Sequence, residues 1–517
     1  MPRWAALLGP ALFAVALYLP SLGNPLVWDD ELHVPLAREM TVGEAFGNAG
    51  GEYRRPLVLL SYLAQWKAGA GADAALHAVN VLLHSGNAML LALLLLNMGL
   101  PTEVAACAAL LFAAHPLQSG SVAYVSGRTD LLAAAFTMTA LIVAQPAPSR
   151  TEPASTRVRS TSRSREMCVT LACAACVALA ALSKEIGLVA GPLAALFVYY
   201  RIRRGRPASL LTAIAALMSC ACCALWVLPP AALAANLPMS LRLRAAGTAA
   251  VTYAGLLVWP SGLHLDRLSP TRGDEALVIA LALCALAAAL SLRFARAPTL
   301  AGLGLLSVLA LYLPGSGLIP VAPAIVERFV FTPEQFLYLP LAPLCALLAA
   351  ALHRYSGNSA LLVVTATLAL ASVPAVLARQ REFAGAEQVY RATLAHSSSA
   401  RACFNLGGLQ LDDLRYAEAA SSYERCVELS PHDGGARGQL AIAYQKLGRA
   451  DQARANYRRA IELDDRSPLL WSNFATLDAN EGRYGDAREK WQHALALDPS
   501  FPPALSALEK LERAMSR

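Results

Sequence analysis

Residues 76–98 read LHAVNVLLHSGNAMLLALLLLNM and contain no Asp, Glu, Lys or Arg. A helix of this length rises far enough to cross the hydrocarbon core of a bilayer, which is about 30 Å thick. The sequence therefore predicts an all-α, polytopic transmembrane bundle of about 11 spans. The other apolar segments lie near residues 4–22, 102–118, 129–145, 166–183, 185–200, 208–228, 274–292, 298–314, 336–352 and 358–378.

The composition of the 517-residue chain agrees with a membrane protein, because 56% of its residues are hydrophobic and only 15% are charged. The mean hydropathy of +0.44 is high for a soluble domain. The formal charge of +7 does not indicate nucleic acid, since the arginines stand in short runs between apolar segments. Orientation signals of membrane proteins lie at such places, so we expect a lipid bilayer as partner and no nucleic acid.

The arginine runs also predict an orientation. With eleven spans and the amino terminus inside, the runs in 150–165, 201–206 and 293–296 fall on the inner side. The apolar piece 246–260 would break this agreement as a full span, so we expect it to be interfacial. The first segment is expected to stay uncleaved. The carboxy-terminal region then shares the outer compartment with loops 23–75, 115–129, 183–186 and 314–335.

From about residue 400 a period of 34 residues appears, with small residues at Ala419, Ala453 and Ala487. An aromatic residue follows each alanine by four positions. This spacing resembles tetratricopeptide repeats, an α-solenoid that binds peptides or proteins on its concave face. Docking of the chain onto itself is the alternative. We expect a linker helix at 381–400 and a repeat domain at 401–517, with a capping helix after the units 405–431, 437–465 and 470–499.

The cysteines indicate neither a disulfide framework nor a metal centre. Nine of the eleven lie in apolar segments, where a free thiol behaves as a small hydrophobe. Cys173 and Cys176 form a CxxC motif with no second pair and no nearby His, which favours helix packing over zinc. The acidic residues are spread over different loops, so no metal site is required, and a divalent ion is left open.

Polar residues gather at the outer ends of the predicted spans. Asp29 and Asp30 lie just after the first span, where partial desolvation raises the pKa of a carboxyl group and makes it a competent proton acceptor. A solvated acidic turn is the alternative. Arg54 and Arg55 suit either a phosphate or snorkelling to lipid headgroups. Further candidates for substrate contacts or for a buried structural network are His77, Asn80, His84, His115, Arg128, Asp130, Lys184, Glu185, Glu327 and Arg328.

These motifs occur in one order along nearly the whole chain: WDDE at 28–31, YRRPL at 53–57, SGRTDLLA at 126–133, SKE at 183–185, YAGLLVWPSGLHLD at 253–266 and LPGSGLIP at 313–320. Together with the repeats they resemble the transmembrane and tetratricopeptide-repeat-containing O-mannosyltransferase family. That family is similar to the GT-C glycosyltransferases, so the resemblance implies a GT-C-like membrane domain over residues 1–380.

The resemblance implies transfer of a sugar, mannose first, from a polyprenyl-phosphate carrier to Ser or Thr hydroxyls of a protein acceptor. Asp29 would be the base and Asp30 would orient it or the sugar. The leaving phosphate would be bound by Arg54, Arg55, Arg128 and Lys184, which stabilise developing charge. The other polar candidates would position the substrate, and no cofactor is required.

Two other interpretations stay open at this point. The same chemistry could act on a lipid or glycan acceptor, or the chain could be a non-catalytic, membrane-anchored scaffold organised by its repeats. The high Ala and Arg content and short loops indicate a bacterial inner-membrane protein with the repeats in the periplasm; the endoplasmic reticulum membrane would give the same topology.

Overall fold

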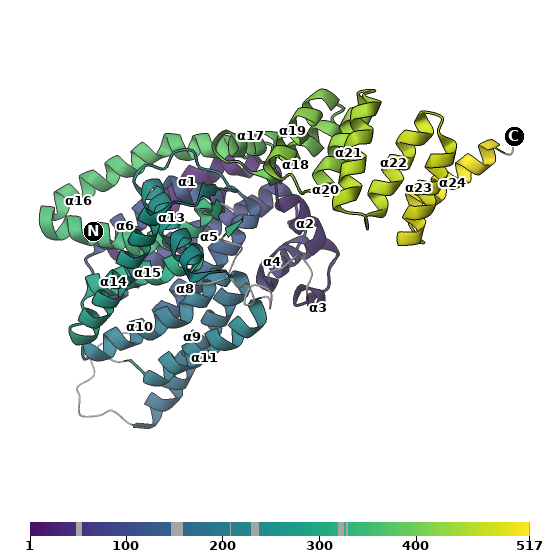
Figure 1. Ribbon diagram of the computed structural model, residues 1–517. Coiled ribbons are helices and arrows are strands. Elements are labelled where there is room, and N and C mark those ends of the chain that lie inside the picture. The colour runs from purple at the N-terminus through teal and green to yellow at the C-terminus, as the bar shows by residue number, and fades with distance from the viewer. Residues whose placement is uncertain are drawn as a thin grey trace. The chain divides into compact units, whose positions relative to one another are not determined.

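The structure, a computed structural model, describes residues 1–47, 54–145, 159–206, 208–228, 237–318, 325–326 and 329–515. The chain divides into two compact units, Met1–Val389 and Tyr390–Arg517. Helices form nearly all of the regular structure in both units (Figure 1). The expectation of an all-α chain therefore holds for the described residues, apart from three short strands that they form in the first unit.

The first unit consists mainly of long helices joined by short helical turns. Its α-helices are α1 (Arg3–Tyr18), α2 (Asp30–Glu39), α3 (Val42–Ala45), α4 (Pro56–Lys67), α5 (Asp73–Met98), α6 (Thr102–Ala114), α7 (Ser119–Val122), α8 (Arg128–Val143), α9 (Arg159–Ser183), α10 (Ala190–Arg203), α11 (Leu210–Val227), α13 (Met239–Val258), α14 (Asp274–Arg296), α15 (Leu300–Tyr312) and α16 (Leu341–Glu382). The 3-10 helices are η1 (Leu19–Gly23), η2 (Pro116–Gln118), η3 (Val125–Gly127), η4 (Glu185–Val189), η5 (Leu313–Ser316) and η6 (Glu334–Leu337). Strands β1 (Leu268–Pro270), β2 (Ile325–Val326) and β3 (Phe329–Phe331) form an antiparallel sheet in the order β1-β3-β2.

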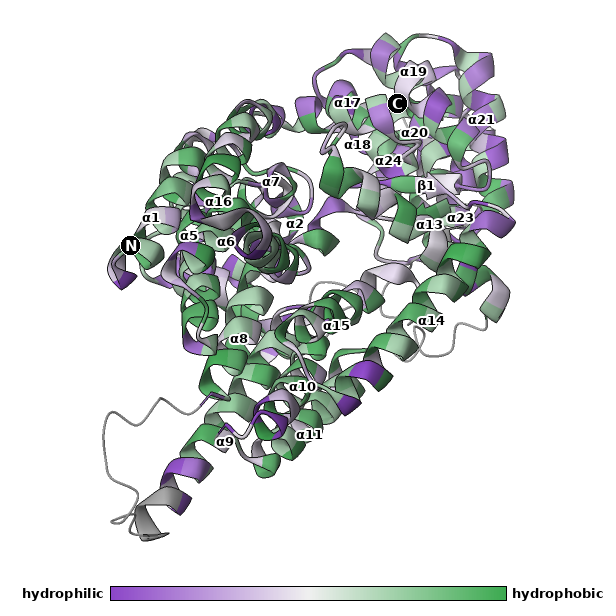
Figure 2. Cartoon of the chain, turned by 90° about the vertical axis from the view of Figure 1, so that its left-hand side faces the viewer, coloured by the Kyte–Doolittle hydropathy of each residue, from purple (hydrophilic) through white to green (hydrophobic). Residues whose placement is uncertain are grey.

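Seven helical segments of the described residues are long and apolar enough to cross a membrane, judged by length and composition. In three of them, α14, α11 and α16, only 11%, 22% and 22% of the most apolar window is buried, and Figure 2 shows hydrophobic residues along most of α14. An apolar helix that stays exposed is typical of a lipid-facing helix. The arrangement of eleven spans stays a prediction, because α6 and α15 are apolar but shorter. The seven are Arg3–Gly23, Asp73–Met98, Arg163–Ser183, Glu185–Arg203, Leu210–Val227, Asp274–Arg296 and Leu341–Glu382.

Two of the apolar segments predicted as separate spans lie in α16, as two helices that meet at a kink. Residues 358–378 and most of 336–352 both belong to α16, which is interrupted at Gly357. Its φ of 77° lies in the left-handed region that glycine adopts without a Cβ clash. The piece 246–260, expected to be interfacial, forms most of α13.

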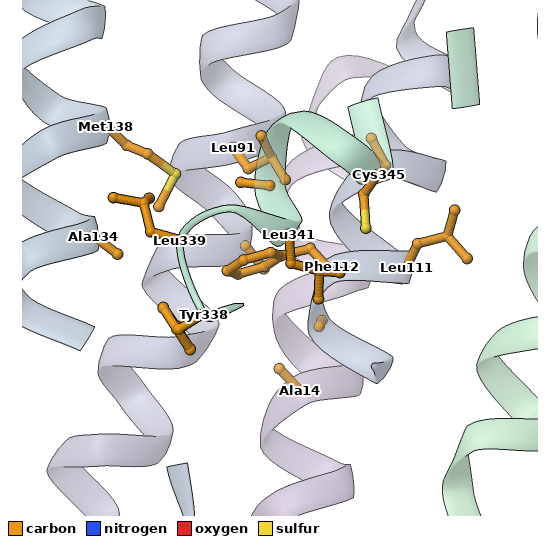
Figure 3. Close-up of a cluster of buried hydrophobic side chains, with 14 of the residues drawn as sticks. Ala14, Leu91, Leu111, Phe112, Ala134, Met138, Tyr338, Leu339, Leu341 and Cys345 are labelled. Atoms are coloured by element: carbon orange, nitrogen blue, oxygen red, sulfur yellow. The ribbon is translucent and has the colours of Figure 1, made fainter. Parts of the chain in front are cut away.

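The core of the first unit forms around α5, which packs against α1, α6 and α8. Buried side chains of these helices meet others from α16, with Phe112 fully enclosed and Tyr338 beside it (Figure 3). Close packing of this kind holds side chains in fixed rotamers. It therefore fixes the direction of the polar side chains that α5 carries on its face toward α8.

The second unit repeats one helix pair in a constant register. Ser399, Asp433 and Ser467 stand 34 residues apart, and each side chain accepts a hydrogen bond from the backbone N–H of the third residue of the helix that follows. Such N-caps satisfy backbone donors that a helix start leaves open. The helices are α17 (Ala386–His396), in which the boundary between the two units falls, α18 (Ala400–Asp412), α19 (Tyr416–Leu429), α20 (Gly434–Lys446), α21 (Ala450–Leu463), α22 (Pro468–Asn480), α23 (Tyr484–Leu497) and α24 (Pro502–Met515).

The small residues of the period lie where paired helices approach. Ala419, Ala453 and Ala487 are fully buried. A Cβ on Gly407 would come within 2.8 Å of the Tyr423 ring, so this position has no room for a side chain. Small residues thus lie at the helix contact, and aromatic residues fill the space beside them.

The turn within each helix pair supplies a stability prediction. Leu414, Gly448 and Gly482 occupy the same turn position with φ values of 62°, 72° and 78°. Leu414 is 69% exposed, so its side chain gains little from burial while its left-handed backbone is strained. We expect Leu414→Gly to raise the free energy of unfolding of residues 390–517 by about 0.5–1 kcal/mol, after the entropy of glycine in the unfolded chain is subtracted.

Urea unfolding followed by circular dichroism measures this change. The matched control, Gly448→Leu, introduces the same strain one repeat later and should lower stability by a similar amount. A stability of Leu414→Gly at or below the wild-type value would contradict the strain argument.

Candidate functional site

The acidic pair lies where the turn after η1 enters α2, with Asp29 in the turn and Asp30 as the first residue of the helix, and the backbone of this turn is strained. Trp28 has a φ of 57°, a left-handed conformation that is rare for a bulky residue, and it is buried. Asp29 is partly buried, and its backbone N–H donates to the hydroxyl of Tyr124 at 3.2 Å. Strained backbone persists only where its surroundings hold it, so this turn is fixed from outside.

Asp30 is one of those constraints. Its fully buried carboxylate accepts hydrogen bonds from the backbone N–H groups of Val27 at 3.4 Å, Val125 at 3.2 Å and Ser126 at 2.6 Å. Asp30 thus joins the turn to the segment before α8. Burial raises the pKa of Asp30 to about 7, although the hydrogen bonds act against the rise.

Arg128 is buried beside this segment and is surrounded by neutral acceptors. Its guanidinium donates to Asn80 Oδ1 at 2.9 Å and to the carbonyl of Leu76 at 2.8 Å, and it lies 4.5 Å from the centre of the Tyr62 ring. Asn80 in turn donates to the carbonyl of Tyr124 at 2.9 Å. Arg128, a predicted phosphate ligand, is fully enclosed and its side chain holds α5 against α8.

The two charges of the SKE motif point to different partners. Lys184 Nζ lies 2.8 Å from both carboxylate oxygens of Asp130, and both side chains are buried. Glu185 accepts two hydrogen bonds from Arg55, at 2.8 and 3.0 Å. A Cβ on Gly187 would come within 2.1 Å of the carbonyl oxygen of Ala180, so glycine is required for the close turn that places both charges.

These contacts bring together charges from four distant segments. Arg55 interacts electrostatically with Glu185, Asp130 and Asp29. Its side chain is 29% exposed, whereas that of Glu185 is 3% exposed. Of the two paired cations that the structure describes in the cluster, Arg55 is therefore more accessible to solvent or a ligand than Lys184.

Other predicted site residues have other surroundings. His84 contacts the hydroxyl of Tyr338 at 2.8 Å and the carbonyl of Ala113 at 3.2 Å, which joins core helices. His115 accepts from the N–H of Leu117 and caps η2. The remaining placements are these: His77 is buried beside the backbone of Asn24 and Pro25, Arg54 lies over the ring of Trp226 at 5.2 Å, and Glu327 and Arg328 lie outside the described residues.

Three residues of this region were not singled out from the sequence: Tyr124, Glu334 and Arg379. Glu334 and Arg379 form a buried ion pair with Nη2 and Oε1 2.9 Å apart. Arg379 directly follows the predicted span 358–378 and Glu334 stands in a predicted outer loop, so a charge next to an apolar segment is the signal that could have found them. For Tyr124 the sequence carries no such signal.

The described residues show no group of three or more His, Cys, Asp or Glu side chains that could hold a metal ion. The pairs found here are of opposite charge, and a carboxylate that is already paired with a cation is a poor ligand for a second one. In such a cluster a partly exposed carboxylate can accept a proton, and a partly exposed guanidinium can stabilise a negative charge.

The fold and the site together define a class of protein. It has a helical unit that contains candidate membrane spans and a charged cluster, and this unit is followed by a helical repeat. Comparison identifies the repeat: residues 410–473 match the tetratricopeptide repeat family model, so the carboxy-terminal region is a tetratricopeptide repeat. No curated protein sequence matches the chain.

Solved structures similar to the chain share low identity with it. The Arabidopsis OM64 TPR domain is 20% identical, with 22% of this chain and 94% of that chain covered and a TM-score of 0.21. A crystal structure of MamA is 19% identical, with 27% and 84% covered and a TM-score of 0.25. YrrB, described as a TPR protein with an unusual peptide-binding site, is 19% identical, with 31% and 87% covered and a TM-score of 0.24.

The raised pKa of Asp30 predicts a pH dependence of stability. The folded protein holds the Asp30 proton up to about pH 7, whereas the unfolded chain releases it near 3.8. The contribution of Asp30 to stability is thus complete below about pH 4 and is lost as the pH rises through 7. We expect the thermal midpoint of Asp30→Asn in detergent to fall less steeply over this interval than that of the wild type. Parallel curves would contradict the assignment.

The pair of Lys184 and Asp130 predicts a second stability effect. Lys184→Met leaves a buried carboxylate without its cation, which costs about 3–5 kcal/mol. The double variant Lys184→Met with Asp130→Leu removes both charges and should recover most of that loss. Thermal denaturation in detergent compares the three proteins. Equal losses in the single and double variants would show that packing, and not the unpaired charge, dominates.

Proposed function

We propose that the chain is a membrane glycosyltransferase that moves a sugar, mannose first, from a polyprenyl-phosphate carrier to Ser or Thr hydroxyls of a protein acceptor. The observation that carries the proposal is the partly exposed carboxylate of Asp29 in a strained turn, within the electrostatic reach of Arg55. The order of motifs along the chain supports the same assignment.

The two acids divide the work in this proposal. Asp29 takes the proton from the acceptor hydroxyl as the sugar is transferred, because its side chain is partly exposed. Asp30 is enclosed and accepts three backbone hydrogen bonds, so it orients the turn that carries Asp29. A hydroxyl becomes a better nucleophile when a positioned carboxylate accepts its proton.

The leaving group is the lipid phosphate, whose charge must be stabilised as the bond to the sugar breaks. Arg55 provides a planar guanidinium suited to phosphate, and Glu185 fixes its direction through two hydrogen bonds. Three charged residues near the site are buried, so in this proposal they hold the site in shape and do not contact the phosphate: Lys184, Asp130 and Arg128. In this proposal Arg55 binds the phosphate, with Arg54 next to it in the chain.

The repeats would hold the acceptor protein. A cavity of about 420 Å³ opens among α17, α18 and α19, and cationic, anionic and hydroxyl side chains line it, including Arg425, Glu418 and Ser422. Tetratricopeptide solenoids bind extended peptides on surfaces of this kind. The proposed setting is the bacterial inner membrane with the repeats in the periplasm.

The proposal is tested by transfer of radiolabelled mannose from polyprenyl-phosphate-mannose to secreted proteins of the same cell, with the full chain purified in detergent. We expect Asp29→Asn to lower transfer about 100- to 10,000-fold, because general base catalysis contributes that much. The matched control is Glu31→Gln, an equivalent change at an exposed acid two residues further on, which should retain transfer.

Each other outcome points to a different function. Transfer from another polyprenyl-phosphate sugar, or onto a lipid or glycan acceptor, would replace the substrates and keep the chemistry. If the wild type transfers no sugar from any donor to any acceptor, the result would favour the membrane-anchored repeat scaffold.

A further inference from the structure

Asp29 is held by a side chain that none of the motifs contains. Its backbone N–H donates to Tyr124, a residue that is 4% exposed. The two residues after Tyr124 donate their backbone N–H groups to Asp30. The segment 124–126 therefore fixes both acids, one through a side chain and the other through its backbone.

Tyr124 is itself held by the end of α16. Its ring stacks on that of Phe383, with centroids 6.2 Å apart and an angle of 20° between the planes. Phe383 is fully buried, and the guanidinium of Arg379 lies 4.7 Å from the centre of its ring. Arg379 pairs with the buried Glu334 and also with Glu382.

The last turn of α16 also holds the other end of the acidic turn. Asn24 donates to the carbonyl of Gln380 at 3.2 Å, and the side chain of Gln380 donates to the carbonyl of Leu17 at 3.0 Å. Gly120 completes the arrangement, since a Cβ there would come within 2.4 Å of Glu334 Oε1. Residues 24 and 29 are thus both fixed, directly or through Tyr124, by residues 379–383.

The geometry points to the last turn of α16 as the positioning element for Asp29, acting through Phe383 and Tyr124. Its catalytic meaning rests on the proposed function. The repeat unit begins at Tyr390, a few residues further along the chain. The last turn of α16, which orients Asp29, therefore lies just before the point where the chain passes from the first unit into the repeat unit.

The test combines backbone hydrogen exchange of residues 24–31 with transfer kinetics of the full chain in detergent. Tyr124→Phe removes only the hydroxyl that accepts from Asp29 and keeps the ring on Phe383. Loss of one hydrogen bond predicts about tenfold faster exchange in this segment and about tenfold lower kcat. The KM for polyprenyl-phosphate-mannose should stay within about twofold, since the donor site is untouched.

The matched control is Tyr338→Phe. The hydroxyl of Tyr338 is the hydrogen-bond partner of His84 at 2.8 Å and of Asn87 at 3.0 Å, so this change removes buried hydrogen bonds from the core of the first unit without touching segment 124–126 or Asp29. It should leave exchange in 24–31 and kcat close to the wild type. Equal effects of both variants would show that Tyr124 contributes only to general stability, which would overturn the proposal.

Phe383→Leu tests the connection to α16. It should speed exchange in 24–31 and lower kcat in the same direction as Tyr124→Phe, whereas Val376→Ala, a truncation in the core two turns earlier in α16, should not. Unchanged exchange in Phe383→Leu overturns the role of α16 even if the wild type transfers sugar. If the wild type transfers none, the proposed function fails, and the exchange measurements still decide whether α16 orients the turn.

Discussion

A charge buried among apolar helices is costly unless a partner of opposite charge or a set of hydrogen bonds compensates it. In the first unit this requirement connects segments that are far apart in the chain. Lys184 meets Asp130, Arg55 meets Glu185 and Arg379 meets Glu334. Each pair joins two loops or helix ends, so the charges that compensate one another also decide how the polar ends of the helices lie. The Asp29 turn depends on this arrangement.

The repeats could be predicted in detail because their information is local. A period of 34 residues sets which residues are small, and the same period places the caps Ser399, Asp433 and Ser467. Each of these contacts links residues of one helix or of neighbouring helices, and the pattern recurs often enough to be recognised. The apolar helices could also be predicted, since their length and hydropathy are local properties. Length and hydropathy alone do not decide how many of these helices span the membrane.

The partners within the site could not be predicted from spacing. Lys184 and Glu185 are adjacent, and the sequence does not show which partner either side chain has. In the structure Lys184 has extended backbone and Glu185 begins η4, so their side chains diverge to Asp130 and Arg55. The sequence also could not show whether Arg54 or Arg55 faces the site, because the direction of two neighbouring side chains depends on the path of the backbone. Tyr124 acts through one hydroxyl and one ring, and no residue pattern marks it.

The constant register of the repeats has a consequence for how such a chain can change its length. Every helix pair carries its own cap at its start and its own left-handed turn residue in the middle, 34 residues from the next. Removing or adding 34 consecutive residues anywhere in the array therefore joins two equivalent points and leaves each helix with a complete set of end contacts. The length of the solenoid is in this sense a modular quantity, adjustable in whole steps, while the first unit offers no such freedom because its contacts are specific to single positions.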